Sequence, residues 1–184
     1  MISPLVSASW LKDNLAHVKT LDGNSHLPAT GRDANAEFAA ARIQGACRFD
    51  IDVVADPHTS LPHTIPSADL FAHAVTAMGI SDDDHVVIYD DSAIMPATRV
   101  WWMFRLFGHE RVSVLDGGLA AWRAVDGPMD TGPFGAPAAG RFSVRASVGA
   151  QIIDQATILA LIAAGNLGQL ADARPTPRFT GDEK

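Results

Sequence analysis

Two kinds of segment alternate along the first 126 residues of the chain. Short runs bounded by polar or turn-forming residues are typical of strands, and they occur at residues 18–21, 46–49, 86–89 and 112–115. Segments with apolar positions three or four residues apart predict helices at residues 7–15, 33–41, 66–78, 96–107 and 118–122. Strands that alternate with helices of this length predict an α/β domain with a mainly parallel central sheet and helices on both faces.

The remaining residues follow a different pattern. Residues 127–146 contain three prolines and many small residues, which predicts a linker. Residues 147–184 predict a strand-like start, a helix at residues 155–164 and a strand at residues 167–171. An aspartate follows this last strand, as it follows the strand at residues 18–21. We therefore interpret the end of the chain as the beginning of an internal repeat.

Composition and charge limit the class of partner. The chain of 184 residues carries a formal net charge of −7, and its pI near 5.3 argues against nucleic acid or an anionic membrane. No apolar run approaches the roughly 20 residues of a membrane-spanning helix, and the first residues lack the basic segment of a secretion signal. The single cysteine is compatible with a reducing compartment. We therefore expect a cytoplasmic protein with neither nucleic acid nor a membrane as its partner.

The loop after the strand at residues 86–89 lies where open α/β sheets place their ligand sites, at the carboxyl end of a strand. It begins with Asp90 and Asp91 and offers no cysteine or serine nucleophile with a nearby base. Two carboxylates could form a general acid–base pair or bind Mg²⁺. No third acidic residue follows at a metal-ligand spacing, so we expect no metal. We favour a structural interpretation in which both residues cap the next turn near a helix N-terminus.

Three other groups could carry chemistry. Cys47, the only thiol, falls inside an expected strand and far from the strand-end loops, so we predict that it is buried and unreactive. His58 and His63 share a proline-rich loop without a carboxylate at metal-ligand spacing, which favours exposed surface histidines. Arg174 and Arg178 could clamp a carboxylate or a sulfur oxyanion, although their spacing alone favours solvated surface charges.

The motifs of several other enzyme classes are absent from the sequence. It contains no glycine-rich phosphate loop and no dinucleotide fingerprint, because the pair Gly117–Gly118 is too short for either. It also contains no Gly-x-Ser-x-Gly turn of the serine hydrolases and no Cys-x5-Arg loop of the cysteine phosphatases. No cofactor is therefore expected.

Several segments together resemble the two-domain rhodanese-like sulfurtransferases, which include thiosulfate sulfurtransferase and 3-mercaptopyruvate sulfurtransferase. The matching segments are residues 42–46 and 49–51, Val-Ile-Tyr-Asp at 87–90, Arg-Val-Trp-Trp-Met-Phe-Arg at 99–105, Phe-Gly-His at 107–109, and residues 112–119 with Trp122. Residues 165–178 resemble the entry into the second domain of such proteins. Arg42 and Gln44 stand where the family usually has a histidine and a proline, which should change only local structure.

The resemblance implies a rhodanese-like three-layer fold and two similarly folded domains. Residues 1–126 would form the first, non-catalytic domain, residues 127–146 a linker, and residues 147–184 the beginning of a second, truncated domain. In such proteins a loop cysteine of the second domain attacks the sulfane sulfur of the donor and becomes a persulfide. The persulfide passes its sulfur to cyanide, a thiol or a protein acceptor.

Three residues take roles from the resemblance. Asp90 occupies, in the inactive domain, the position that the nucleophile has in the active one. Arg178 corresponds to a substrate-binding arginine of the segment Asp-Ala-Arg-x-x-x-Arg-Phe, and Arg174 is its supporting neighbour.

Because the chain ends at Lys184, before the catalytic loop could appear, we expect part of a sulfurtransferase that is inactive alone. Its donor in the intact protein would be thiosulfate or 3-mercaptopyruvate, and its partner the missing second domain. The alternative is a stand-alone inactive module for binding or regulation.

Overall fold

The computed structural model describes residues 2–146 and 152–182. The chain divides into two compact units, residues 1–150 and residues 151–184. Each unit is described separately below. The first unit contains the whole sheet, and therefore the loops at which ligand sites are expected.

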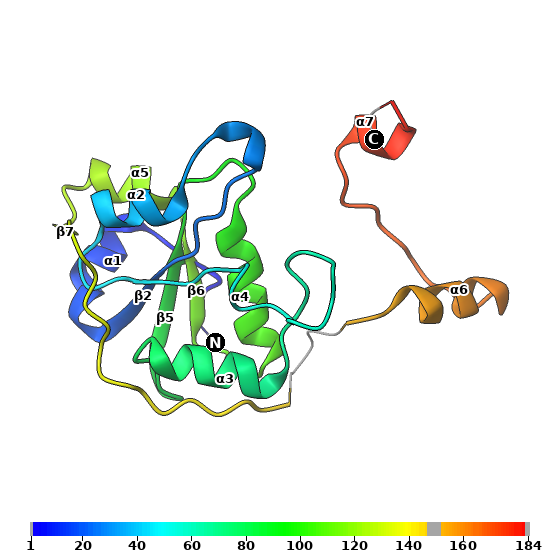
Figure 1. Cartoon of the computed structure of the whole chain (residues 1–184), viewed down its shortest axis with the longest axis horizontal. Helices are drawn as coiled ribbons and strands as arrows, with labels where there is room; N and C mark the ends of the chain where they lie inside the picture. The colour runs from blue at the N-terminus through cyan, green and yellow to red at the C-terminus, as the bar shows by residue number, and fades with distance from the viewer. Residues whose placement is uncertain (1, 147–151, 183–184) are drawn as a thin grey trace. The chain divides into compact units, whose positions relative to one another are not determined.

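A five-stranded parallel sheet forms the centre of the first unit (Figure 1). In spatial order its strands are β1 (Leu5–Val6), β6 (Val112–Leu115), β5 (His85–Tyr89), β2 (Val18–Asp22) and β4 (Cys47–Arg48). The strands predicted at residues 18–21, 46–49, 86–89 and 112–115 are confirmed, although β4 is shorter than expected. Strand β1 escapes prediction because two residues are too few to show a period.

Five α-helices cover this sheet. They are α1 (Ala8–Asn14), α2 (Ala34–Ala40), α3 (Ala68–Ala77), α4 (Pro96–Leu106) and α5 (Gly118–Ala124), with short 3-10 turns η1 (Leu15–His17) and η2 (Pro28–Thr30). The side chains of Ser7, Asp33 and Ser67 accept backbone N–H groups at the starts of α1, α2 and α3. Pro96 begins α4 at a position where its missing N–H costs nothing. The five helices predicted for this part of the chain are confirmed.

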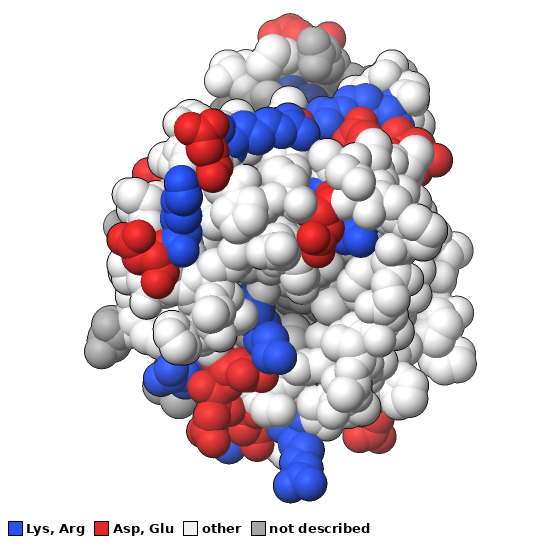
Figure 2. Space-filling model, turned by 90° about the vertical axis from the view of Figure 1, so that its left-hand side faces the viewer, with Lys and Arg blue, Asp and Glu red and all other residues white. Residues whose placement is uncertain are grey.

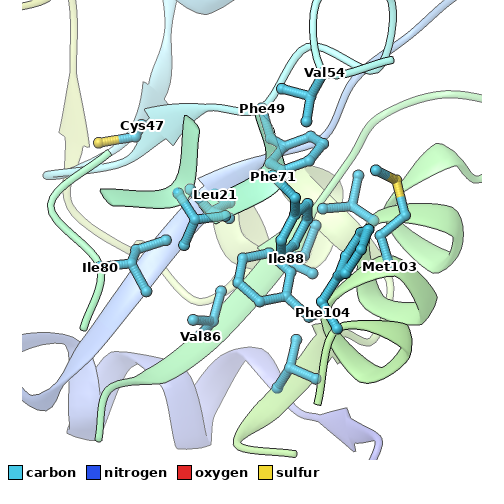
Figure 3. Close-up of a cluster of buried hydrophobic side chains, with 14 of the residues drawn as sticks. Leu21, Cys47, Phe49, Val54, Phe71, Ile80, Val86, Ile88, Met103 and Phe104 are labelled. Carbon is cyan, nitrogen blue, oxygen red and sulfur yellow. The ribbon is translucent and has the colours of Figure 1, made fainter. Parts of the chain in front are cut away.

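Alternation along β5 sends side chains into two separate cores. Val86 and Ile88 pack against α3 and α4 on one face, in the aromatic cluster of Figure 3. Val87 and Tyr89 pack on the other face against α1, α2 and α5. Each fully buried side chain of this kind contributes about 1.5–3 kcal/mol to folding. The three-layer arrangement and the mainly parallel sheet are therefore confirmed.

The segment expected to be a linker, residues 127–146, is fastened to the first unit. Strand β7 (Met129–Asp130) pairs antiparallel with β3 (Arg42–Ile43). Farther along, the Gly140 N–H donates to the Thr76 carbonyl at 2.8 Å, and the Phe142 side chain is buried in the α3–α4 core. The first unit thus extends well past residue 126.

The second unit contains two helices among its described residues, α6 (Gln155–Ala163) and α7 (Thr176–Thr180). The helix predicted at residues 155–164 is confirmed. The strand predicted at residues 167–171 is wrong, because these residues form no strand and Leu170 is 63% exposed. A strand requires a neighbouring strand to satisfy its backbone groups, and the described residues of this unit supply none. The strand-like start predicted at residue 147 lies outside the described residues.

Candidate functional site

Asp90 is the first residue after β5 and caps the N-terminus of α4. Its Oδ2 accepts the Ala97 backbone N–H at 2.9 Å, and its carbonyl oxygen accepts the Leu119 N–H at 3.0 Å. Burial raises the pKa of the Asp90 carboxyl, and the bond from the Ala97 N–H opposes that change. A Cβ atom at Gly118 would lie 2.2 Å from the Asp90 carbonyl oxygen, so only glycine allows α5 to approach. The predicted capping role of Asp90 is confirmed.

Asp91 and Ser92 brace this loop against the loop that follows β2. The Asp91 N–H donates to Asn24 Oδ1 at 2.7 Å, and Ser92 Oγ donates to the Ser25 carbonyl at 2.7 Å. Arg32 Nη1 donates to the Asp91 carbonyl at 2.8 Å. Within residues 2–146 and 152–182, no group of three or more His, Cys, Asp or Glu is placed to hold a metal ion. Asp90 holds its loop in place through its carboxylate, and Asp91 does so through its backbone N–H and carbonyl groups.

A small polar hollow of about 140 Å³ lies at the same edge of the sheet. Its polar lining comes from Asp22, Asn24, Arg32, Glu37, Asp91 and Arg123. Arg32 is already neutralised there, because its Nε lies 2.7 Å from Glu37 Oε1 and its Nη2 lies 3.5 Å from Asp91 Oδ2. The hollow therefore contains charges that largely satisfy one another.

The surface around α1 and α5 carries mixed charge. Figure 2 shows the face that lies at the left of Figure 1. On this face Lys and Arg side chains lie beside Asp and Glu side chains, so it is not a continuous basic patch. No helix within the described part of the chain is long and apolar enough to cross a membrane.

Cys47 lies at the margin of the α3–α4 core (Figure 3). Its side chain is buried, and its Sγ donates to the Met78 carbonyl at 3.4 Å. Burial raises the pKa of the Cys47 thiol and outweighs the opposing charge of Lys19. A catalytic cysteine needs an accessible thiolate, which requires the opposite change. The prediction of a buried cysteine is confirmed.

The structure pairs a histidine with a carboxylate in the loop between β4 and α3. His63 Nε2 lies 2.7 Å from Asp52 Oδ1, and the two side chains are 40% and 66% exposed. His63 has a φ of 56°, a left-handed conformation that is uncommon for residues other than glycine. Even as an ion pair, an exposed contact of this kind would contribute only about 0–1 kcal/mol, so stability alone does not account for a strained residue here. We regard the pair as a candidate proton-transfer group.

The sequence indicates only half of this pair. The predicted loop position of His63 is confirmed, although the residue is only partly exposed, and nothing in the spacing points to Asp52 as its partner. The two meet because the intervening segment closes on itself, where the Asp56 N–H donates to the Thr64 carbonyl at 3.4 Å. A left-handed backbone at a histidine leaves no pattern in the sequence.

The two predicted substrate-binding arginines lie in the second unit and differ in their surroundings. Arg174 forms a bidentate pair with Asp172, with Nε–Oδ1 at 3.0 Å and Nη2–Oδ2 at 2.6 Å. Hydrogen bonding within this pair raises the pKa of Arg174 and lowers that of Asp172. Arg178 lies in α7 rather than in a loop, its side chain is exposed, and no ion pair involves it within the described residues.

Comparison with known proteins places these features in a family. The family described as "Rhodanese-like domain" matches residues 7–125. The human 3-mercaptopyruvate sulfurtransferase is 38% identical and covers 97% of this chain, and the Escherichia coli K12 enzyme of that name is 33% identical and covers 96%. A mitochondrial thiosulfate/3-mercaptopyruvate sulfurtransferase of Arabidopsis thaliana is 48% identical over 123 residues, or 66% of this chain. The chain spans only 62%, 63% and 32% of these relatives, respectively.

Solved structures agree with this assignment. The crystal structure of SseA from Escherichia coli, described as a 3-mercaptopyruvate sulfotransferase with the rhodanese fold, has a TM-score of 0.86 at 32% identity. The match covers 98% of this chain and 69% of SseA. The Tum1 protein of Saccharomyces cerevisiae has a TM-score of 0.84 at 25% identity, with 97% of this chain and 63% of Tum1 covered. The chain therefore belongs to the rhodanese-like sulfurtransferase family.

Proposed function

We propose that this chain is the donor-handling part of a sulfurtransferase whose donor is 3-mercaptopyruvate. Relatives from human and Escherichia coli that match nearly the whole chain are named for that donor. The observation that carries the choice of donor is the exposed Asp52–His63 pair. Its importance follows from a difference between the two candidate reactions.

The two donors place different demands on proton transfer. A cysteine thiolate that attacks the sulfur of 3-mercaptopyruvate forms an S–S bond and breaks the bond between that sulfur and C3. The electron pair goes to C3, which takes a proton, while the S–H group of the donor loses one, and the products are a persulfide and pyruvate. With thiosulfate, the attack breaks an S–S bond and releases sulfite, and no proton has to move. A histidine oriented by a carboxylate suits the first reaction.

The attacking thiolate would come from outside this chain. Cys47 is buried and its thiol pKa is raised, which disfavours a thiolate. Asp90 cannot form a persulfide, and its carboxylate already binds the N-terminal N–H of α4. In an active copy of the same loop, that helix terminus would instead stabilise the sulfur anion. We propose that the first unit is the inactive copy of a repeated domain and that residues 147–184 begin the second copy.

Arg178 would bind the carboxylate of the donor. Its guanidinium is exposed and presents a fork of N–H donors that matches a carboxylate. Arg174 would support it indirectly, since Asp172 already compensates the charge of Arg174. The acceptor of the persulfide sulfur would be a thiol or cyanide.

The test compares two histidines of one loop in the complete gene product. His63→Gln should lower kcat with 3-mercaptopyruvate by about 10²–10⁴-fold, the usual contribution of a general acid–base group, and should affect thiosulfate turnover much less. His58→Gln is the matched control, because His58 lies in the same loop and is exposed. Unchanged turnover of 3-mercaptopyruvate by His63→Gln would remove the pair from the reaction. Absence of sulfur transfer from either donor in the wild type would overturn the proposed reaction itself.

A further inference from the structure

Arg99 connects helix α4 to the loop that carries His63. It lies in the first half of α4, and its Nη2 donates to the His63 carbonyl oxygen. The side chain is partly buried, and burial lowers the pKa of Arg99. No carboxylate lies within ion-pair distance of Arg99 among residues 2–146 and 152–182. A partly buried guanidinium without an anionic partner is costly, and its retention calls for a specific role.

Two buried polar atoms without a hydrogen-bond partner lie in residues that adjoin His63. One is Arg99 Nε, and the other is Oγ1 of Thr64, the next residue after His63. Buried polar groups in native proteins are almost always paired, so each exception calls for an explanation, of which a functional role is one. Their grouping at one histidine sets this loop apart from the rest of the described first unit.

The left-handed backbone of His63 explains what the Arg99 contact does. A residue other than glycine keeps such a conformation only when its surroundings hold it there. The Arg99 bond holds the carbonyl of His63 itself, and the bond from Asp56 to the Thr64 carbonyl closes the loop beside it. Rotation of the His63 backbone would move its imidazole away from Asp52. The guanidinium therefore contacts the main chain of the residue that carries the imidazole.

We propose that Arg99 is a positioning residue. It keeps the imidazole of His63 beside the Asp52 carboxylate for proton transfer to and from the sulfur donor. The inference rests on the proposed function in naming the reaction, whereas the link from Arg99 to the His63–Asp52 pair is independent of it. Arg99 itself touches no reacting atom in this account. Two measurements test these parts separately.

The first measurement uses the 184-residue chain and needs no turnover. The imidazole ¹⁵N resonances of His63 report its contact with the Asp52 carboxylate. Arg99→Ala should shift them to the positions seen in Asp52→Asn, and Arg99→Lys, which can still donate to the carbonyl, should restore them in part. Arg105→Ala is the matched control, since Arg105 lies on the same helix and stacks on Trp101 at 5.2 Å. Wild-type His63 resonances in a folded Arg99→Ala chain would overturn the proposal.

The second measurement uses the complete gene product and both donors. Arg99→Ala should lower kcat with 3-mercaptopyruvate by about 10-fold or more, with a much smaller effect on thiosulfate and on KM, because proton transfer is impaired and binding is not. An equal loss with both donors would mean that Arg99 is merely structural and would refute the positioning role. If His63→Gln leaves turnover of 3-mercaptopyruvate intact, the proposed function fails instead, and the resonances of His63 still decide whether Arg99 positions it.

Discussion

At the scale of single residues, Asp90 shows how one carboxylate keeps a strand-end loop closed. Its side chain takes the first free N–H of α4, and its main chain binds the start of α5. Both bonds require the close approach that Gly118 permits. The N-terminus of α4 is thus occupied by the Asp90 carboxylate of the same loop. We attribute the absence of a nucleophile in this loop to that structural role.

The stability of the protein should report the ionisation of Asp90. Because burial raises the pKa of Asp90 in the folded state, folding favours its protonated form. The associated stability is fully present below the unfolded pKa of about 3.9 and is lost as pH rises through the folded pKa. The Asn side chain of Asp90→Asn does not ionise and keeps an oxygen for the Ala97 N–H. As pH rises from about 4 to 7, the wild type should therefore lose stability relative to Asp90→Asn.

Urea denaturation of both proteins across this pH range measures the difference. Asp90→Ala, which loses the cap altogether, is the comparison variant and should cost about 1 kcal/mol at pH 7. Parallel stability curves for the wild type and Asp90→Asn would show that Asp90 has the same pKa in the folded and unfolded states.

At the scale of elements, the segment of residues 127–146 is held in place by Arg42. The guanidinium is buried and donates to the carbonyls of Gly132 and Phe38 at 2.9 and 3.2 Å. It also lies over the Phe38 ring at 4.9 Å. Arg42 thus binds the segment that follows β7 to the edge of the domain.

Removal of this guanidinium should loosen the segment. Arg42→Ala loses three hydrogen bonds from a charged donor and two cation–π contacts, so we expect a cost of about 2–4 kcal/mol in the free energy of unfolding. Cleavage by a protease between residues 131 and 139 should become faster. Arg141→Ala, an exposed arginine of the same segment, is the control. Equal stability and equal cleavage rates for Arg42→Ala and Arg141→Ala would show that Arg42 does not hold the segment.

The elements also show where sequence patterns succeed and fail. The strand at residues 86–89 is predictable because burial on both faces demands an apolar run, and the helices are predictable because their apolar faces repeat. The strand at residues 167–171 fails because pairing is non-local, and no strand lies beside it among the described residues. Likewise, the burial of Cys47 and the capping role of Asp90 could be predicted from the local sequence pattern. The contact between Asp52 and His63 could not, because it depends on how a loop closes.

At the scale of the whole molecule, the two units differ in how much of their apolar surface is covered. The first unit buries two apolar clusters on opposite faces of its sheet. In the second unit the helix α6 has no buried residue, and Leu159, Ile162 and Phe179 are more than half exposed. The stability of the described chain therefore resides in the first unit. In our proposal the catalytic thiolate likewise lies outside the chain, while the proton-transfer pair lies within it.

The most direct test locates the sulfur after one turnover. The complete gene product is mixed with 3-mercaptopyruvate without an acceptor, and its peptides are analysed by mass spectrometry for one added sulfur atom. Our account expects a persulfide on a cysteine outside residues 1–184, release of pyruvate, and an unmodified Cys47. A persulfide on Cys47, with pyruvate release that Cys47→Ser abolishes, would contradict it.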